Sequence, residues 1–440
     1  MPYYTHAMKL AEKKFYPWIV VALLWVVALL NYMDRQMLST MRDAMAADIS
    51  DLESKVMFGK IMAAFMWIYG FMSPLSGMVA DRVNRKWLIV ISLAVWSGVT
   101  IMMGYATTYS EIYWLRAAMG VSEALYIPAA LSLIADYFTG KQLSLAIGIH
   151  MTGLYMGQAV GGFGAFVASA VSWQSAFHVF GLAGVAYAVA LVFLLREKRT
   201  YSFETPAEKA VKAPVGEVLR DNLKAIGSSL GMLVTSIAFW SILFFFASCS
   251  VPGWATKNWL PTLFADSLGI DMVTAGPVAT ITIAFASFVG VMVGGPMADR
   301  WSRTNLRGRI YTSSIGLAMM IPSLVLMGFG STLAAAIGAA VLFGLGYGLF
   351  DANNMPILCQ FVSSRQRAMA YGFMNSVGVI MGAITTQLLG GLAEKVGLGM
   401  CFAFMGVILV VALVLQLAVL RPKYDDKDQE LNLEAETIAE

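Results

Sequence analysis

Gly77-Met-Val-Ala-Asp81-Arg82-Val-Asn-Arg85 recurs 218 residues further along the chain as Gly295-Pro-Met-Ala-Asp299-Arg300-Trp-Ser-Arg303, so that both copies share the pattern G-x-x-x-D-R-x-x-R. A weaker correspondence pairs the stretch 137–148 with the stretch 361–372. The sequence therefore predicts two halves that are copies of one unit. Parallel repeats of this kind are typical of carriers that bind their substrate between the halves, near the middle of the membrane.

The rest of the chain is apolar enough to place both halves in a membrane. Of its 440 residues, 58% are hydrophobic and 13% are charged, which is unusual for a soluble protein. Because a span needs about 20 mostly apolar residues, the sequence predicts an all-α membrane protein with twelve transmembrane helices in two six-helix repeats. The predicted spans are 17–40, 56–80, 87–107, 111–137, 143–170, 174–195, 230–261, 273–298, 309–328, 332–359, 368–394 and 398–420. We expect the seventh to kink or break at Pro252-Gly253, since proline removes a helical hydrogen bond.

Positive charges orient these spans. Lys and Arg residues of the short loops gather on the side that carries the N-terminus, which the positive-inside rule assigns to the cytoplasm. We expect a multi-pass protein of the cell's inner (plasma) membrane with both termini cytoplasmic. Its predicted parts are a six-helix bundle at 1–195, a central cytoplasmic linker at 196–229, a second six-helix bundle at 230–424 and a cytoplasmic tail at 425–440.

Four charged residues lie inside predicted spans. Asp34 and Arg35 stand side by side in a stretch with no other charge between 18 and 38. Arg116 and Glu123 are seven residues apart, close to two helical turns, so their side chains face the same way. Charges at membrane depth are costly and normally serve a function. A purely structural pair of salt bridges is disfavoured because a buried ion pair rarely adds net stability. We interpret the four residues as one constellation.

The chemistry of the constellation suggests a division of roles. The planar guanidinium of arginine holds a carboxylate with two hydrogen bonds. Burial raises the pKa of a carboxyl group, whereas a neighbouring arginine lowers it, so a contact with arginine that forms and breaks changes the affinity for a proton. The sequence therefore indicates anion binding by the arginines and proton coupling by the carboxylates.

The charged residues of the repeated loops are interpreted as gates. Exposed ion pairs are individually weak, so they suit contacts that join neighbouring helices in one conformation and part in another. We expect no direct substrate contact from them. The gating residues are Asp81, Arg82, Arg85, Asp299, Arg300 and Arg303.

Further polar residues have two open interpretations each. Gln158 follows Gly157 in a series of G-x-x-x-G spacings, and it either joins helices or lines a pocket. Lys257 either extends its amine toward the membrane surface or faces the substrate. Asp351 is either a third functional carboxylate or a partner of the asparagines after it, at a helix distortion before Pro356.

Other function classes find no support in the sequence. The net charge of +3 comes without a basic stripe, so no nucleic-acid partner is expected. The 3 cysteines lie in apolar segments and do not suggest a disulfide framework. No Gly-rich loop for ATP phosphates and no metal-ligand spacing occur, so we expect no metal, no cofactor and no enzyme activity.

The repeated loops resemble the signature loop of the major facilitator superfamily, and the resemblance covers the whole chain. Asn31-Tyr-Met-Asp34-Arg35 and Arg116-Ala-Ala-Met-Gly-Val-Ser-Glu123 resemble motifs of its anion:cation symporter family, which includes sugar-acid:proton symporters, sialin and vesicular glutamate transporters. The Spinster family of lysolipid carriers shares both patterns and is also echoed by Leu133-Ile-Ala-Asp136. Leu154 and the polar stretch 351–354 depart from the sugar-acid pattern, so the choice between these families stays open.

The sugar-acid resemblance implies roles for individual residues. It implies proton coupling by Asp34 and Glu123 and binding of the substrate carboxylate by Arg35 and Arg116. Lys257 stands where relatives of the glutamate type carry an arginine. The polar positions that could meet the rest of the substrate are Tyr32, Tyr69, Gln158, Asn353, Asn354 and Asn375.

These observations predict a secondary active transporter that imports a small organic anion, such as a hexuronate or a hexonate, with protons by alternating access. One alternative is a Spinster-like carrier of lysolipids or other amphiphiles. Another is a membrane receptor that carries nothing. The expected partners are the anionic substrate, protons and membrane lipid, and we expect a monomer.

Overall fold

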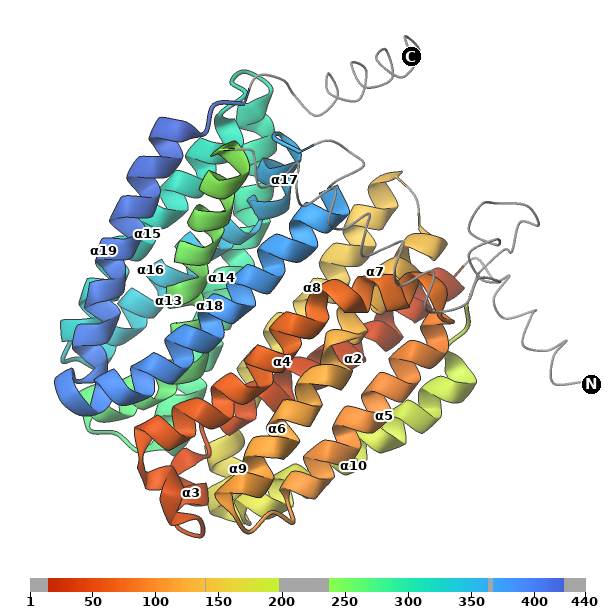
Figure 1. Ribbon diagram of the computed structural model, residues 1–440, viewed down its shortest axis with the longest axis vertical. Helices are drawn as coiled ribbons and strands as arrows, with labels where there is room; N and C mark the ends of the chain where they lie inside the picture. Colours follow the sequence, from red (N-terminus) through yellow and green to blue (C-terminus); the bar gives the residue numbers. More distant parts are fainter. Residues whose placement is uncertain (1–14, 139, 198–236, 363–366, 423–440) are drawn as a thin grey trace, which may run out of the picture. The chain divides into compact units, whose positions relative to one another are not determined.

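The computed structural model describes residues 15–138, 140–197, 237–362 and 367–422, which form α-helices joined by short connections (Figure 1). No β-strand occurs in these ranges. Apart from its first two residues, the predicted linker at 196–229 lies outside the described residues, as does the tail at 425–440.

The first half of the chain forms nine α-helices and one 3-10 helix within its described part. They are α2 (Tyr16–Leu38), α3 (Arg42–Ala46), η1 (Ser50–Glu53), α4 (Lys55–Arg82), α5 (Arg85–Met103), α6 (Tyr109–Ala124), α7 (Tyr126–Tyr137), α8 (Gly140–Gly161), α9 (Gly164–Ala170) and α10 (Trp173–Leu194). The second half forms α13 (Ile237–Leu268), α14 (Met272–Ser302), α15 (Gly308–Phe329), α16 (Leu333–Asp351), α17 (Asn354–Cys359), α18 (Arg367–Val396) and α19 (Leu398–Val419).

Most of the helices are long enough to cross a membrane. In the described residues, 11 helical segments combine sufficient length with sufficient apolar character. They correspond to all but one of the predicted spans. The remaining span, at 143–170, is formed by α8 and α9, where His150 and Gln158 make the segment more polar. The chain is therefore an all-α, multi-pass membrane protein.

Side chains at the helix starts explain several of the boundaries. The Thr108 side chain accepts a hydrogen bond from the backbone of Glu111, whose carboxylate in turn accepts from the backbone of Thr108, which is a capping box at the start of α6. The side chain of Asn84 caps α5 by accepting a hydrogen bond from the backbone of Trp87, and the side chain of Thr332 caps α16 by accepting one from the backbone of Ala335. Gly397 has a positive φ of 82°, which allows the sharp turn from α18 into α19.

Helix interruptions occur at places that differ in part from the prediction. Of the kink or break expected at Pro252-Gly253, the break is wrong, since α13 is continuous there. A side chain at position 253 would come within 2.6 Å of the Tyr347 ring, so the glycine serves close packing on α16. The fourth span is divided between α6 and α7, just before Pro128.

The predicted distortion before Pro356 is confirmed, because the tenth span is divided between α16 and α17. Pro128 and Pro356 each lie in the first turn of the helix after the break. There a proline cannot donate a hydrogen bond to the helix before it, so the preceding helix ends.

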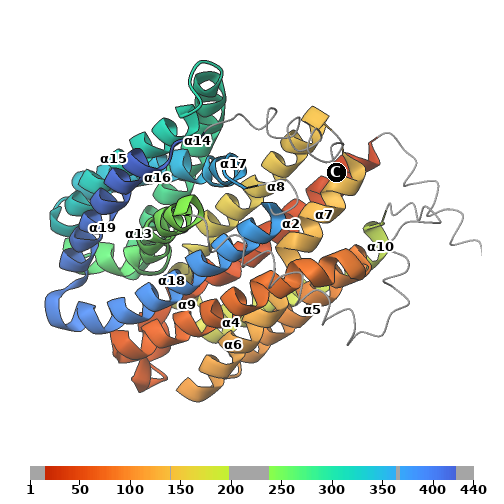
Figure 2. The same cartoon turned by 45° about the horizontal axis from the view of Figure 1, so that its top comes forward.

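Helix α8 packs closely on α2, and Figures 1 and 2 show the two helices next to each other. A Cβ atom on Gly153 or Gly161 would meet backbone oxygens of α2, at 2.6 Å from Trp25 and 2.8 Å from Met33. A Cβ atom on Gly157 would collide with the carbonyl oxygen of Leu29. The G-x-x-x-G series thus allows the close helix approach that its spacing indicated.

We expect Gly157→Ala to lower the melting temperature of the purified protein by a few degrees. Forcing a methyl group into a packed contact costs about 1–3 kcal/mol. The matched control is Gly148→Ala on the same helix, because nothing lies within 4 Å of the added atom there. Thermal unfolding of both variants in detergent measures the difference. Equal melting temperatures would show that α8 can move away from α2 without a loss of stability.

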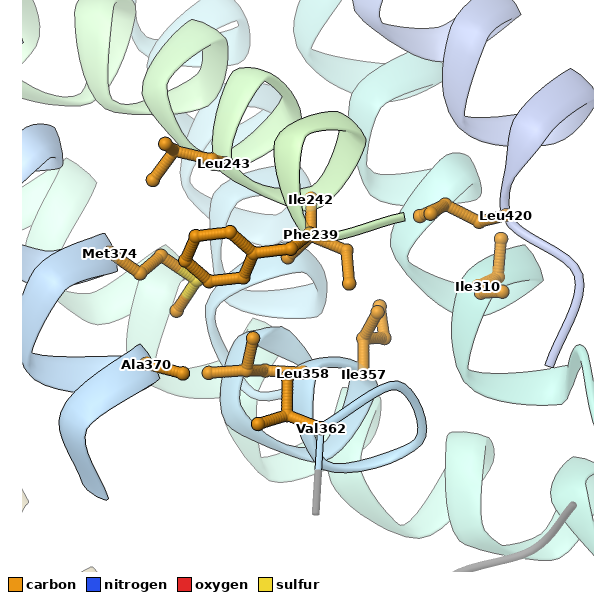
Figure 3. Packing of buried hydrophobic residues seen from close by; sticks show 10 residues of the cluster. All are labelled: Phe239, Ile242, Leu243, Ile310, Ile357, Leu358, Val362, Ala370, Met374 and Leu420. Carbon is orange, nitrogen blue, oxygen red and sulfur yellow. The ribbon is translucent and has the colours of Figure 1, made fainter. Parts of the chain in front are cut away.

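The chain divides into two compact units. Of the described residues, the first unit contains those within 1–208, 257–281 and 386–391, and the second contains those within 209–256, 282–385 and 392–440. The core of the second unit includes a cluster in which apolar side chains from α13, α15, α17, α18 and the end of α19 meet (Figure 3). Its buried members are Phe239, Ile242, Leu243, Ile310, Ile357, Leu358, Val362, Ala370, Met374 and Leu420.

Candidate functional site

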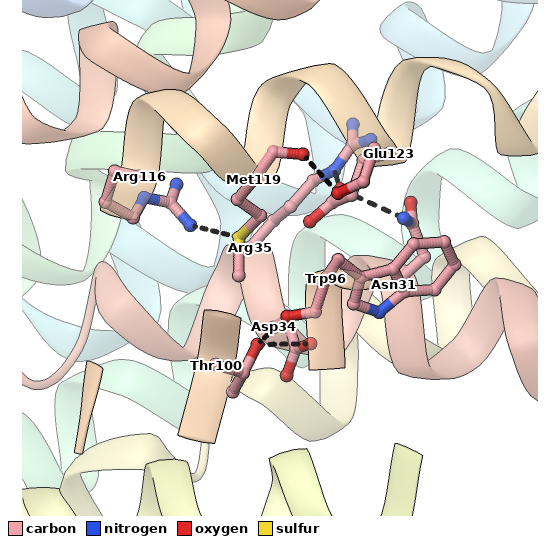
Figure 4. A network of polar contacts seen from close by, with 9 residues as sticks. Asn31, Asp34, Arg35, Trp96, Thr100, Arg116, Met119 and Glu123 are labelled. Atoms are coloured by element: carbon pink, nitrogen blue, oxygen red, sulfur yellow. Dashed lines mark hydrogen bonds and ion pairs between the residues drawn. The ribbon is translucent and has the colours of Figure 1, made fainter. Parts of the chain in front are cut away.

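The charged stretch of α2 directs its side chains toward different neighbours. Successive residues on a helix are separated by about 100°, so Asp34 and Arg35 face different helices although they are adjacent in sequence. Arg35 reaches Glu123 on α6, whereas Asp34 reaches Thr100 on α5 (Figure 4). No ion pair joins Asp34 to Arg35 or Arg116 in the described part of the chain.

Arg35 and Glu123 form a buried ion pair. The Nε of Arg35 donates to Oε2 of Glu123 over 2.6 Å, and the Glu123 side chain has no exposed surface. The Nδ2 of Asn31, one helical turn before Arg35, donates to the same oxygen over 2.9 Å. Two donors on α2 therefore hold one carboxylate of α6.

Three aromatic rings surround the Arg35 guanidinium. Its central carbon lies 5.0 Å from the ring centre of Tyr32, 4.7 Å from that of Phe65 and 4.7 Å from that of Tyr69. Rings at this distance attract a cation. Helix α4, which carries Phe65 and Tyr69, can lie this close to α6 because Gly120 faces it, where a Cβ would be 2.6 Å from the Phe65 oxygen.

Arg116 occupies the other side of the cluster without a carboxylate partner. It is 3% exposed, its guanidinium lies 4.9 Å from the Phe65 ring centre, and its Nη1 is 3.2 Å from the sulfur of Met119. In the described residues no carboxylate lies within ion-pair distance of it. The Phe65 ring is thus in contact with both arginines, of which Arg35 alone is paired.

Several polar atoms of this cluster are buried and lack a hydrogen-bond partner among the described residues. They include Nη2 of Arg35, Nε of Arg116 and Oε1 of Glu123. Buried polar groups are almost always hydrogen-bonded in proteins. The cluster therefore offers two donors and one acceptor to a molecule that the chain does not supply.

Lys257 and Gln158 belong to the same compact unit as the arginines. The Lys257 amine lies 6.0 Å from the Tyr32 ring centre, and the backbone oxygen of Lys257 accepts a hydrogen bond from Gln36 over 2.8 Å. This places the lysine beside a ring that also contacts Arg35. Gln158 is buried on α8.

The predicted asparagines lie in the second unit. Asn353 donates to the backbone oxygen of Leu349 over 2.8 Å, and Asn354 donates to Asp351 over 3.3 Å. The polar run therefore satisfies groups near the helix break, as one of the two interpretations expected. Asn375 lies on α18 and is half-buried.

The repeated loops form ion pairs within their own halves. Arg85 pairs with Asp136 at the end of α7, and Asp299 pairs with Arg309 on α15 over 3.2 Å. Arg300 and Arg303 are exposed. Asp81 and Arg82 lie at the end of α4, and their side chains are outside the described set.

Sequence reasoning assigned no role to Asn31, Phe65, Thr100 and Met119, which contact the charged residues. Asn31 could have been found, because it precedes Arg35 by one turn and so shares its helix face. Phe65 and Met119 have no such signal, since apolar side chains are common throughout the spans. In the described residues no group of three or more His, Cys, Asp or Glu could hold a metal ion.

A helical membrane fold with a repeated charged loop and a buried charge cluster is typical of a polytopic membrane transporter. The sequence profile of the Major Facilitator Superfamily matches residues 24–386 and 259–438. The chain belongs to this superfamily, as its repeated loops predicted, and its fold is the major facilitator fold.

The sequence identity between this chain and individual relatives is low. The hexuronate transporter of Bacillus subtilis (strain 168) is 26% identical over 86% of this chain and 88% of its own length. Protein spinster homolog 1 of Xenopus laevis is 25% identical over 88% of this chain and 75% of its own length. The crystal structure of a bacterial homologue of the human lysosomal transporter Spinster, inward-facing and unoccupied, matches with a TM-score of 0.73 at 21% identity, covering 92% of this chain and 97% of that one.

Proposed function

We propose that the protein imports a small hydroxylated organic anion of the sugar-acid type, such as a hexuronate or a hexonate, by symport with protons. The observation that carries this proposal is Arg116, a buried guanidinium that has no carboxylate of the described residues within ion-pair distance. A buried charge without a partner is costly. An anionic substrate would supply the missing partner.

The free atoms around Phe65 fit a hydroxy acid. The substrate carboxylate would accept hydrogen bonds from Nε of Arg116 and Nη2 of Arg35, while a substrate hydroxyl would accept a hydrogen bond from Oε1 of Glu123 once that oxygen carries a proton. A planar guanidinium suits a carboxylate better than an ammonium group does, because it presents donors in a fixed fork. The similarity to a hexuronate transporter supports this substrate class.

Proton coupling follows from the Arg35–Glu123 pair. Oε1 of Glu123 has no hydrogen-bond partner among the residues that the structure describes and is the position at which a proton would bind. Protonation would neutralise Glu123 and weaken its attraction for Arg35, which would then carry an unpaired charge for the substrate. Binding of the proton would thereby favour binding of the anion, which is the linkage that symport requires.

Alternating access would use the charged loops as gates. The Arg85–Asp136 pair and the Asp299–Arg309 pair each join neighbouring helices of one half. Such pairs contribute little to stability, so they can exchange partners when the halves reorient. Asp81, Arg82, Arg300 and Arg303 are proposed to take part in the same exchange.

We further propose the inner (plasma) membrane as the location, with both termini in the cytoplasm. Epitope tags at Lys209 and at either terminus should be inaccessible to antibody in intact cells and accessible after permeabilisation, since the basic loops stay on the cytoplasmic side. Accessibility of the Lys209 tag from outside would refute this topology.

The second candidate is an amphiphile carrier, supported by the similarity to a Spinster homologue. Thermal shifts of the purified protein with hexuronate, hexonate and a lysophospholipid separate the two. A ligand at 100 times its dissociation constant stabilises by about 2.7 kcal/mol. We expect a shift with a sugar acid, and proton-driven uptake of it into proteoliposomes. Stabilisation by the lysophospholipid alone would favour the second candidate, and binding without counterflow would indicate a receptor.

A further inference from the structure

The second half of the chain contributes two segments to the first compact unit. They are 257–281, which covers the end of α13 and the start of α14, and 386–391 of α18. The amine of Lys55 on α4 pairs with Asp266 of α13 over 2.7 Å. A Cβ atom on Gly276 of α14 would lie 2.6 Å from the backbone oxygen of Gly162, just after α8. The segment 257–281 is therefore packed closely against the first half.

Gln36 of α2 makes a polar contact with the start of this segment. Its side chain is 5% exposed, and its Nε2 donates to the backbone oxygen of Lys257 over 2.8 Å. The same nitrogen donates to Oγ of Ser39 over 2.7 Å, and the Ser39 hydroxyl donates to the backbone oxygen of Gln36. Two hydrogen bonds therefore fix the direction of the Gln36 side chain.

A proline explains why the Lys257 carbonyl accepts a bond from another helix. Inside an α-helix this carbonyl would accept from the backbone N–H four residues later. That residue is Pro261, which has no N–H, although α13 continues to Leu268. In packed membrane helices a neighbouring helix can supply the donor that a proline removes. The amide of Gln36 supplies it here.

The residue that Gln36 holds by its backbone also reaches the charge cluster by its side chain. The Lys257 amine lies 6.0 Å from the ring centre of Tyr32, and the guanidinium of Arg35 lies 5.0 Å from the same ring centre. Gln36 directly follows Arg35 on α2. One short stretch of α2 therefore carries an arginine of the site and fixes the peptide from which the lysine extends.

We propose that Gln36 is a positioning residue, which brings Lys257 to the anion site as a third cation when the segment 257–281 is closed against the first half. This role rests on the proposed transport of an anion. To open the path on its side, the segment has to leave α2, and the bond from Gln36 to Lys257 then breaks. The anion would meet three cations in the closed form and two in the open form.

This difference links substrate binding to closure. A ligand that binds one of two conformations more tightly shifts the population toward that conformation. An anion that gains Lys257 on closure would therefore favour the closed form. Gln36 would determine how much of this gain is available, although it does not contact the substrate itself.

Gln36→Leu tests the proposal, because leucine has a similar size but no hydrogen-bond donor. The loss of one buried hydrogen bond corresponds to a change of about tenfold. We expect the KM for a hexuronate or hexonate in proteoliposomes to rise by about this factor. The matched control is Gln416→Leu, which removes a bond from a buried glutamine to a backbone oxygen in the second unit and should leave KM unchanged.

Closure has a readout that needs no substrate. Thr280 of α14 is 3% exposed, and its hydroxyl donates to the backbone oxygen of Ala159 on α8 over 3.3 Å. A cysteine introduced as Thr280→Cys should react slowly with maleimide in the purified protein and about tenfold faster when Gln36→Leu is added. The 3 native cysteines are buried, and the parent protein gives their background.

Adding Pro261→Ala separates positioning from a purely structural role. Alanine restores the N–H that the Lys257 carbonyl would accept within α13, so the melting temperature lost in Gln36→Leu should return in the double variant. The contact between the helices stays absent, so KM and the rate of alkylation should stay raised. Pro261→Ala alone should keep both at wild-type values, because a carbonyl oxygen can accept two hydrogen bonds.

Two results would overturn the proposal. One is a wild-type KM and a wild-type rate of alkylation in Gln36→Leu. The other is the return of both quantities to wild-type values when Pro261→Ala is added, which would show that Gln36 only fills the place of the missing N–H. If neither sugar acid is transported by the wild type, the proposed function fails, and the rate of alkylation still decides whether Gln36 holds the segment closed.

Discussion

Arg116→Met is expected to weaken recognition of the anionic substrate strongly while leaving the protein folded. Methionine keeps an unbranched chain against Phe65 and removes the charge. Loss of one partner from a desolvated charge pair costs about 2–5 kcal/mol, which corresponds to a fall in kcat/KM of roughly 30-fold to several thousand-fold. Arg116→Lys should be intermediate, since it keeps the charge but loses the planar fork. Uptake into proteoliposomes at several substrate concentrations measures the effect.

The melting temperature of the variant distinguishes an anion-binding role of Arg116 from a structural role. Because Arg116 forms no ion pair in the described residues, removal of its charge relieves a burial cost and should not lower the melting temperature. The matched control is Lys60→Ala, which removes an exposed cation from the same compact unit and should transport normally. Normal uptake by Arg116→Met, or a large fall in its melting temperature, would exclude the anion-site assignment.

The sequence predicts the helices of this protein well because membrane spans leave a strong apolar signal. The interruptions are harder to predict, as Pro128 and Pro252 show. Proline ends the preceding helix at Pro128, yet α13 continues through Pro252. Neighbouring groups in a packed membrane helix can replace the hydrogen bond that proline removes. That compensation depends on tertiary contacts, which one sequence does not reveal.

The contacts within the charge cluster are also hard to predict from the sequence. Spacing places Arg116 and Glu123 on one face of a helix, and the structure brings Glu123 to Arg35. Spacing does not say which arginine takes the carboxylate, because that depends on how α2, α4 and α6 pack. Glycines such as Gly120 allow this close packing. The sequence alone does not distinguish a glycine at a close helix contact from a glycine elsewhere. The interactions of Thr100 with Asp34 and of Phe65 with both arginines follow from the same packing.

Glu123→Gln is expected to separate substrate exchange from concentrative transport. Glutamine imitates the protonated side chain and leaves Arg35 without a carboxylate partner. The variant should bind substrate and exchange labelled for unlabelled molecules, since exchange needs only the loaded carrier to reorient. It should not accumulate substrate under a proton gradient, because no proton is released from position 123 on the inner side. Asp34→Asn tests the second predicted coupling residue in the same way, and exchange should survive in at least one of the two variants.

Counterflow and gradient-driven uptake in the same proteoliposomes measure these outcomes. The control is Glu53→Gln, which neutralises an exposed carboxylate of the same unit and should retain both activities. Transport by Glu123→Gln should also lose much of its dependence on pH, because one of the two groups proposed to bind and release the proton is gone. If Glu123→Gln and Asp34→Asn both still concentrate substrate under a proton gradient alone, neither residue carries the proton. The Arg35–Glu123 pair would then hold α2 against α6 without taking part in coupling, and Asp351 and His150 would be the next residues to replace.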